Sequence, residues 1–203
     1  MSQNKTNFAV PLAFVGMMFF AIGFALGINS FLIPVLKGAL SLPSGVAYLL
    51  LAATFVPFLI FGYPASATIA KIGYKRTMAL SFLIFAVAFI LFVLSAKLEN
   101  FILFLIASFV SGAANAYLQA SVNPYITILG PIESAAKRMS IMGICNKLAW
   151  PVAPLFFALV VADQTNVQTS DLYLPFYIII GVFLLLGIIS LMAPLPEVKA
   201  AGG

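Results

Sequence analysis

Six long apolar segments, separated by short polar breaks, constrain what this chain can fold into more than any other feature. A helix needs about 20 apolar residues to cross the roughly 30 Å hydrocarbon core of a bilayer. Stretches of at least that length occur at residues 8–36, 46–70, 77–96, 101–129, 140–162 and 172–193. Turn formers and nearly all the charges fall between them, at residues 41–45, 71–76, 97–100, 130–138 and 163–171. Membrane β-barrels alternate apolar and polar residues, so these continuous runs predict an all-α membrane protein with six transmembrane helices.

Composition excludes several classes of protein. Hydrophobic residues make up 64% of the chain and charged residues 7%, with a mean hydropathy of +1.17. Soluble domains carry about 25% charged residues, so water could not keep this chain in solution. The sequence has no histidine and one cysteine, Cys145, which rules out a zinc site, an internal disulfide and a Ser-His-Asp triad. We expect no enzyme, no cofactor and no metal, because no ligand cluster or buried carboxylate pair exists to run such chemistry.

The distribution of lysine and arginine predicts the orientation in the membrane. The first apolar run is far longer than the 7–15 residues of a signal-peptide core, so we interpret it as a retained span. With the N-terminus inside, the inner side carries Lys5, Lys71, Lys75, Arg76, Lys137, Arg138 and Lys199, and the outer side carries Lys37 and Lys97. This favours a multi-pass protein of the cytoplasmic (inner) membrane with both termini in the cytoplasm. The scattered basic charges reflect topology and predict no nucleic-acid partner.

The polarity of the spans repeats. In each set of three, the first span is polar, the second mixed and the third almost purely apolar. Asn29 precedes Pro34 by five residues, and Gln119 precedes Pro124 by five, with 90 residues between the pairs. Three spans per unit is an odd number, so the second unit must be inverted, and such repeats mark the substrate site of secondary transporters. Coincidence is the alternative, since Asn and Pro are common residues.

We therefore predict a 3+3 inverted repeat. The transmembrane bundle would cover residues 1–193, with one three-helix unit at 8–96 and the other at 101–193. Residues 194–203 would form a cytoplasmic tail or the start of a linker.

A row of polar residues runs along the fourth span. Positions four residues apart stay contiguous on a helix and wind slowly around it. The row cannot face acyl chains, because each unsatisfied amide costs a few kcal/mol in hydrocarbon. It either bonds neighbouring helices together, at about 0.6 kcal/mol per bond, or borders a water-filled cavity. Five members and a bend at a proline favour the cavity; they are Ser111, Asn115, Gln119, Asn123 and Thr127, with the bend at Pro124.

Lys147 is the one charge expected deep in a span. It follows Arg138 by nine residues, or about 14 Å of helix, which places it near the middle of the hydrocarbon. A central lysine costs about 3 kcal/mol, and snorkelling is poor this far from either interface. The acidic residues all fall in loops or tails: Glu99, Glu133, Asp163, Asp171 and Glu197. The partner of Lys147 is therefore a carboxylate on another polypeptide, an anionic substrate, or hydroxyls and water.

Trp150, the only tryptophan, lies one helical turn from Lys147 and shares its face with Gly143 and Pro154. It is twelve residues from Arg138, which is too deep for an interfacial belt. An indole face packs well against the C–H face of a sugar ring, while lysine and amides bind hydroxyls. These residue types together indicate a sugar.

Several of these residues resemble the N-terminal half of a major facilitator superfamily carrier, and most closely the fucose–proton symporter and glucose/galactose transporter family. The resemblance rests on NSFLIP at 29–34, KIGYKR at 71–76, QASVNPYITILGP at 119–131, Arg138 and Asn146. It implies symport through about twelve spans in two six-helix halves, with sugar bound between them. This chain would then supply one half and require a second, as a homodimer or a separate C-terminal partner. PLPEVK at 194–199 looks like the start of the linker.

The sequence also departs from that family. Fucose symporters have an aspartate where Ser30 stands, a glutamate where Gln119 stands and a glutamine where Gly143 stands. In the basic loop, Ser66 and Ala70 replace the usual glycine and aspartate. The resemblance therefore does not extend to proton coupling through this half, and the substrate can differ from fucose.

These observations predict half of a secondary transporter that moves a sugar or similar polyhydroxy solute by alternating access. The alternative is a non-transporting membrane scaffold or an inactive fragment. We expect the site to be lined by Asn29, Ser30, Asn115, Gln119, Asn123, Asn146, Lys147 and Trp150. We expect conformational roles for Pro34, Lys71, Gly73, Lys75, Arg76, Pro124, Arg138 and Pro151.

Overall fold

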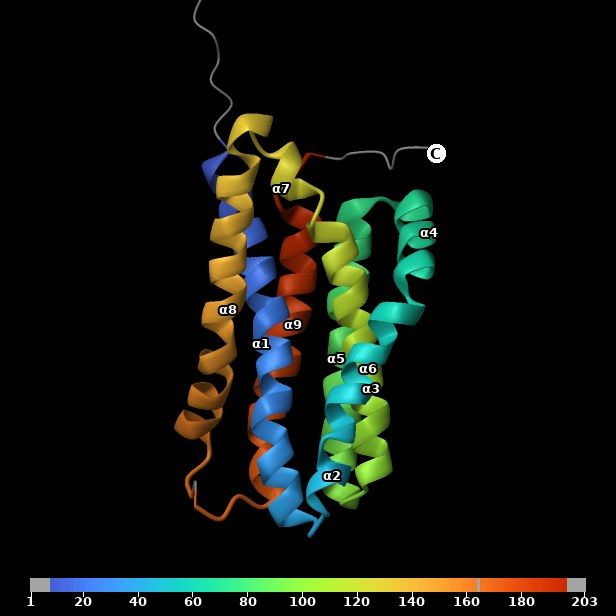
Figure 1. The fold of residues 1–203 in the computed structure, drawn as a ribbon, viewed down its shortest axis with the longest axis vertical. Coiled ribbons are helices and arrows are strands. Elements are labelled where there is room, and N and C mark those ends of the chain that lie inside the picture. The colour runs from blue at the N-terminus through green and yellow to red at the C-terminus, as the bar shows by residue number, and fades with distance from the viewer. Residues whose placement is uncertain (1–7, 164, 197–203) are drawn as a thin grey trace, which may run out of the picture.

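The computed structural model describes residues 8–163 and 165–196, and these are almost entirely helical. Figure 1 shows the long helices side by side along the long axis, with the start of α1, α7 and the end of α9 at one end of the bundle. The elements are α1 (Ala9–Ala39), α2 (Ser44–Ala47), α3 (Leu49–Ile60), α4 (Gly62–Ile72), α5 (Tyr74–Leu98), α6 (Phe101–Val122), α7 (Tyr125–Ile128), η1 (Ile132–Ser134), α8 (Ala135–Val160), η2 (Thr169–Leu172) and α9 (Tyr173–Met192).

Within the described residues, five segments are long and apolar enough to cross a membrane, and a sixth is a bent pair. The pair joins residues 44–60 and 62–72 at an angle of 55°. The break lies at Phe61, between α3 and α4. Pro64 has no N–H to donate to the carbonyl of Ile60, and Gly62 is a weak helix former. The protein is thus an all-α membrane protein with five or six candidate spans, and the sequence did not predict this bend.

Proline has different effects in the other spans. Helical hydrogen bonding in the fourth span is interrupted at Pro124, between α6 and α7, although Asn123 and Pro124 keep right-handed helical φ and ψ. Residues 101–128 therefore form one span with no bend of more than 40°, and the sequence overestimated the effect of this proline. In contrast, α1 continues as one helix through Pro34, and α8 continues through Pro151 and Pro154.

Aromatic side chains interlock between α5 and α9 in the core. Phe183 of α9 lies 4.9 Å from Phe85 and 5.5 Å from Phe89, measured between ring centroids. Phe92 stacks on Phe176 at 5.5 Å. Helices in lipid gain little from the hydrophobic effect and associate through close packing instead. These interlocking rings therefore fix α5 against α9 on the side of the bundle away from the viewer in Figure 1.

Glycines allow two other helix pairs to approach at backbone distance. A Cβ on Gly23 of α1 would collide with the main-chain carbonyl of Asn146 on α8. A Cβ on Gly27 would lie 2.7 Å from the carbonyl oxygen of Trp150. Small residues at helix interfaces permit this approach. The stretch of α8 that carries the predicted site residues is consequently held directly on α1.

Arg138, expected in a basic loop, is buried instead. Its Nε donates to the carbonyl of Ile126 at 2.6 Å, and its Nη2 to that of Thr127 at 3.3 Å. Its Nη1 donates to the carbonyl of Pro131 at 3.0 Å and to Ser134 Oγ at 2.6 Å. The last carbonyls of a helix have no partner within it. Arg138 therefore caps the short helix α7 that follows the break in the fourth span.

Two further contacts complete this end of the bundle. Gly130 adopts φ +150°, and a Cβ there would lie 2.6 Å from Arg138 Nη1, so only glycine fits beneath the guanidinium. The Tyr125 hydroxyl donates to the carbonyl of Pro196 at 2.9 Å, and Leu195 is buried. The segment that leaves the last span is thus tied to α7.

The basic residues that were predicted to lie on opposite sides of the membrane lie at opposite ends of the bundle. Lys71, Lys75 and Arg76 lie where α4 meets α5, at the same end as α7, and Lys37 and Lys97 lie at the opposite end. Lys97 Nζ lies 5.7 Å from the ring centroid of Tyr173 and 5.9 Å from that of Tyr177. Lys5 and Lys199 lie outside the described residues. A multi-pass membrane protein follows from the apolar spans, while the cytoplasmic location of the termini stays a prediction.

Gly23→Ala should lower the thermal midpoint of the detergent-purified chain. The added Cβ collides with the Asn146 carbonyl, and overpacking of this kind costs about 1–3 kcal/mol. Gly38→Ala is the matched control, because it lies in the same helix where a Cβ would meet nothing within 4 Å. Equal midpoints for the two variants would show that α1 and α8 do not pack this closely.

Arg138→Lys should also destabilise the fold, although it keeps the charge. A lysine cannot reach carbonyls and a hydroxyl on several sides of the guanidinium, and each unsatisfied buried group costs about 1–3 kcal/mol. We expect a lower thermal midpoint and faster proteolysis between residues 123 and 134. The exposed neighbour Lys137→Met is the control. An Arg138→Lys protein as stable as that control would remove the capping role.

Candidate functional site

A hollow of about 350 Å³ opens beside the middle of α8. Its walls come from α1, from the broken end of the fourth span and from α8. It is lined by Phe19, Asn123, Ile126, Met139, Gly143, Asn146 and Lys147. The structure therefore brings together three of the predicted binding residues, Asn123, Asn146 and Lys147. Phe19 and Met139 were missed, because nothing distinguishes an apolar residue at a site from its apolar neighbours.

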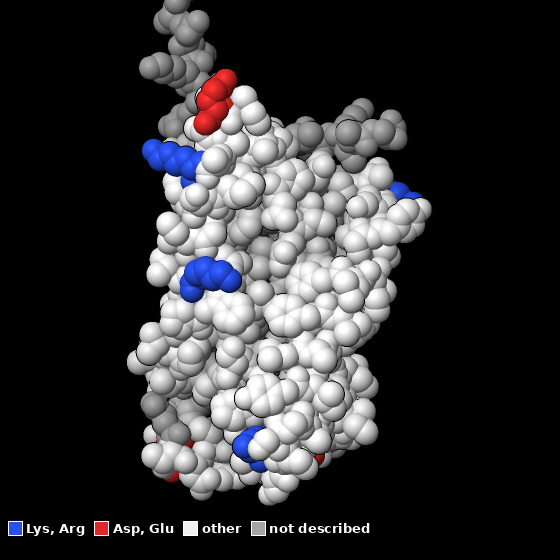
Figure 2. Space-filling view, viewed as in Figure 1, with Lys and Arg blue, Asp and Glu red and all other residues white. Residues whose placement is uncertain are grey.

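Lys147 lies at the midpoint of its helix. It is twelve residues from the start of α8 and thirteen from its end, or about 18–20 Å from either. The side chain is exposed on this bundle. In Figure 2 a basic patch lies midway along the long axis over α8, whereas the other charged patches on this face lie toward its ends. The structure thus places this charge midway along the bundle, and its depth in the membrane stays a prediction.

The Trp150 ring faces the ammonium of Lys147. Lys147 Nζ lies 5.2 Å from the ring centroid, a distance at which a cation–π contact contributes about 0.5–2 kcal/mol depending on desolvation. The Trp150 Nε1 atom is buried and has no hydrogen-bond partner in the described structure. Its main chain is held against Gly27. Trp150 therefore serves as a platform anchored between α8 and α1.

No described carboxylate is positioned to neutralise Lys147. Glu99 accepts a hydrogen bond from Thr169 Oγ1 at 3.0 Å, and Asp171 accepts one from the Gln168 N–H at 2.9 Å. Hydrogen bonds from the Thr165 side chain and backbone lower the pKa of Asp163, so this carboxyl is charged at neutral pH. The fourth, Glu133, lies in η1. These residues all lie in the connections between helices rather than at the level of the hollow.

Asn146 has a structural contact as well as a place in the hollow. Its Nδ2 donates to the main-chain carbonyl of Phe19 at 3.4 Å. This bond connects two walls of the hollow across the close contact between α1 and α8. It orients the amide beside Lys147.

The polar row of the fourth span divides into two parts. Asn115 is 1% exposed, and its Oδ1 accepts a hydrogen bond from Gln119 Nε2 at 3.2 Å. Asn123 and Thr127 are exposed, and Asn123 lines the hollow. The inner part of the row is thus satisfied within the bundle, and the outer part reaches the hollow. Asn115 and Gln119 are not among the lining residues.

The first-span candidates lie elsewhere. Asn29 is 3% exposed, and its Nδ2 donates to Thr54 Oγ1 at 2.8 Å. That hydroxyl in turn donates to the carbonyl of Leu50 at 2.8 Å. Ser30 is exposed on α1 but does not line the hollow. Asn29 therefore bonds α1 to α3, and a substrate role for either residue stays a prediction.

The basic loop of the predicted gate is a tight turn. Gly73 is the single residue between α4 and α5 and has φ +88°, a conformation that favours glycine. Lys71 and Arg76 are exposed and Lys75 is half-buried. Their gating role is untested by this arrangement.

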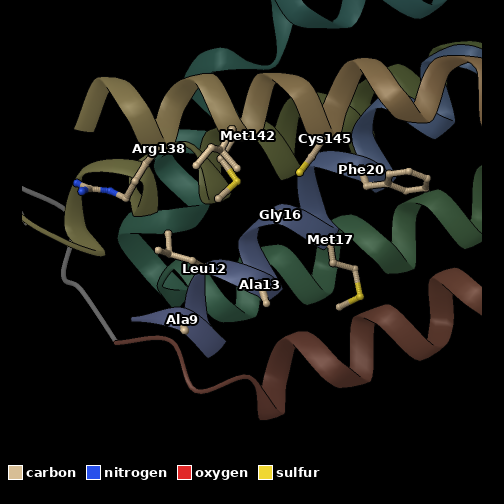
Figure 3. Close-up of a pocket in the computed structure, with 10 residues that line it drawn as sticks. Ala9, Leu12, Ala13, Gly16, Met17, Phe20, Arg138, Met142 and Cys145 are labelled. Carbon is tan, nitrogen blue, oxygen red and sulfur yellow. The ribbon is translucent and has the colours of Figure 1, made fainter. Parts of the chain in front are cut away.

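A larger hollow of about 520 Å³ lies between α1 and α8 toward the Arg138 end. Figure 3 shows the Arg138 guanidinium turned away from the labelled side chains of Leu12, Met142 and Cys145. The lining is otherwise apolar, so this space does not suit a polar solute. Among the described residues, no group of three or more His, Cys, Asp or Glu side chains could hold a metal ion.

Comparisons with known proteins agree with this fold. Residues 14–202 match the family model described as Major Facilitator Superfamily. The glucose/galactose transporter of Brucella abortus biovar 1 (strain 9-941) is 30% identical over 203 residues, which cover 98% of this chain and 49% of that protein. The L-fucose-proton symporter of Escherichia coli (strain K12) is 23% identical over 217 residues, covering 97% of this chain and 50% of the relative.

The same similarity appears in three dimensions. The crystal structure of the transporter FucP in the outward conformation superposes with a TM-score of 0.78 at 22% sequence identity, covering 97% of this chain and 53% of FucP. The chain spans about half the length of the curated relatives it matches. Because the family model matches nearly all of the chain and the helical fold agrees, this protein belongs to the major facilitator superfamily.

Proposed function

We propose that this chain is one half of a secondary transporter that moves a sugar or similar polyhydroxy solute by alternating access. The observation that most supports this proposal is the hollow beside the middle of α8. There the exposed ammonium of Lys147 meets the side-chain amides of Asn123 and Asn146 between three spans. Amides and an ammonium bind hydroxyls, and the Trp150 ring beside them suits the C–H face of a sugar. The relatives named as glucose/galactose transporters and fucose-proton symporters support this substrate class.

The helix contacts support a 3+3 inverted repeat of six spans. In such a repeat the first span corresponds to the fourth and the second to the fifth. The close contact of Gly23 with Asn146 then corresponds to that of Gly112 with Thr54, where a Cβ on Gly112 would collide with the Thr54 carbonyl. Gly23 and Gly112 are 89 residues apart, close to the 90 residues between Asn29 and Gln119. The bent pair of α3 and α4 would be the second span.

A second six-helix half is proposed to cover the hollow. Only 17% of the most apolar window of α8 is buried, compared with 39% or more for the other unbroken spans of the described chain. An exposed ammonium on that helix cannot face acyl chains without a large desolvation cost. The partner would be another copy of this chain or a separately encoded C-terminal half. The doubled length of the relatives supports either arrangement.

The two walls of the hollow suit a rocking motion. Asn146 and Lys147 belong to α8, which packs on α1 at backbone distance. Asn123 belongs to the fourth span at its break. Alternating access in this class proceeds by rocking of one bundle against the other around a fixed site. The basic turn around Gly73 and the contacts of Arg138 would then stabilise one closed state at the α7 end.

The competing function is a membrane scaffold that transports nothing. The bond of Asn29 with Thr54 favours it, because it holds α1 to α3 without a solute, and Gln119 likewise bonds Asn115 of its own helix rather than a solute. Asn123 separates the two functions, since it is exposed, lines the hollow and makes no hydrogen bond through its side chain in the described structure.

Asn123→Leu should reduce radiolabelled hexose uptake into proteoliposomes about tenfold, as expected for the loss of one hydrogen bond of about 1–1.5 kcal/mol. Its thermal midpoint should not change, because the amide has no partner in the bundle. Thr127→Val is the matched control, being exposed one turn later and outside the hollow. The assay needs the second half in the same vesicles. Unchanged uptake in Asn123→Leu would favour the scaffold.

A further inference from the structure

We propose that the hollow beside Lys147 binds a carboxylate and that the solute is a sugar acid, a polyhydroxy compound with one carboxyl group. This inference rests on the proposed function and deepens it by naming the charge of the substrate. Four observations carry it: the depth of Lys147, the positions of the acidic residues, the composition of the hollow and the surroundings of the ammonium.

The first step concerns charge balance. Lys147 is exposed at the middle of α8, at a depth where an unpaired ammonium is strongly unfavourable. The carboxylates of the described chain lie in the connections, and those of Glu99 and Asp171 already accept hydrogen bonds there. Charges within spans pair with one another or mark a substrate path. An anion must therefore reach this hollow from outside the bundle.

The second step concerns the rest of the lining. Asn123 and Asn146 add two neutral amides beside the single ammonium. Amides donate to and accept from hydroxyls but do not neutralise charge. One cation with two amides is the complement of one carboxylate with several hydroxyls. A carboxylate side chain from a partner helix would use the ammonium and leave the exposed amide of Asn123 without a role.

The third step concerns size and orientation. The hollow of about 350 Å³ falls in the range of small-molecule sites, roughly 300–1,000 Å³. The Trp150 ring lies 5.2 Å from Nζ and holds the ammonium by its π face. A cation–π contact forms no hydrogen bond to an oxygen or nitrogen acceptor. The three N–H donors of Lys147 therefore stay available for carboxylate oxygens. Asn146, tied to the Phe19 carbonyl, fixes the amide alongside.

Charge pairing would also couple binding to transport. With the hollow empty, closing the second half over Lys147 buries an unpaired ammonium. With a sugar acid bound, the same closure buries a neutral pair. The loaded bundle therefore closes more readily than the empty one, which is the condition for moving solute rather than cycling empty.

The test measures equilibrium binding by the full chain, reconstituted together with its second half in nanodiscs of neutral lipid, using D-galacturonate, D-galactose and acetate as probes. We expect D-galacturonate to bind at least tenfold more tightly than D-galactose, and acetate, which lacks hydroxyls, to bind weakly. Lys147→Gln should abolish the preference for galacturonate, and Lys147→Arg should keep it. Lys137→Gln, at the start of the same helix, should behave as the parent. Lys147 makes no hydrogen bond within the described bundle, so these variants should still fold, with Lys147→Gln losing only the cation–π contact with Trp150.

The outcomes separate this inference from the proposed function. Equal affinity for galactose and galacturonate, unaffected by Lys147→Gln, would overturn the sugar-acid inference and leave sugar transport standing. Binding of neither sugar would overturn both. Co-purification with a second half gives a further outcome. If Lys147→Gln weakened that complex and galacturonate had no effect on it, the anion would be a carboxylate of the partner. The sugar-acid inference would then be wrong.

Discussion

Hydrocarbon offers no hydrogen-bond partner, and this constraint decides where the polar side chains of the bundle lie. Hydroxyls within the spans turn back to their own helix, as Ser81 does to the Thr77 carbonyl at 2.8 Å. Asn29 finds Thr54 on another helix. Lys147 differs, because it is exposed midway along its helix and contacts the Trp150 ring through its ammonium. A charged group with a ring contact and no ion pair in the described structure distinguishes the hollow from ordinary polar packing between helices.

The hollow depends on two different kinds of support. On one side, Gly23 and Gly27 bring α1 onto the backbone of α8 beside Asn146 and Trp150, so that wall is rigid. On the other side helical hydrogen bonding in the fourth span is interrupted at Pro124, and Arg138 donates to the carbonyls of Ile126 and Thr127 just beyond it. A helix break inside a membrane persists only where other groups satisfy its backbone. Close packing on one wall and an arginine cap behind the other therefore hold the same space open.

Much of the fold could be predicted from the sequence, because span length and apolar continuity are local properties. The position of Lys147 midway along its helix followed from local spacing in the same way, whereas Pro124 interrupts hydrogen bonding without the predicted bend. The bend at Phe61 was missed, and continuous helix at Pro34 was not foreseen, since tertiary packing decides whether a proline breaks a span. From the sequence, Arg138 was interpreted as a charged residue of a loop. Its carbonyl partners lie up to twelve residues away in the chain, so no local pattern indicates them. Within the site, spacing along one helix identified Lys147, but which spans face it depends on packing that no local pattern records.

The exposed surfaces of the bundle differ in polarity, and the difference bears on what covers them. Exposed side chains on α5, such as Leu83, Val87 and Ile90, are apolar and suit acyl chains without further explanation. The surface of α8 mixes apolar side chains with Lys147, and Asn123 lies beside it across the hollow. Lipid alone would suit the first surface and not the second. A bundle with one such face is complete toward lipid but incomplete toward its hollow, which is the physical reason for proposing a second half there rather than elsewhere on the bundle.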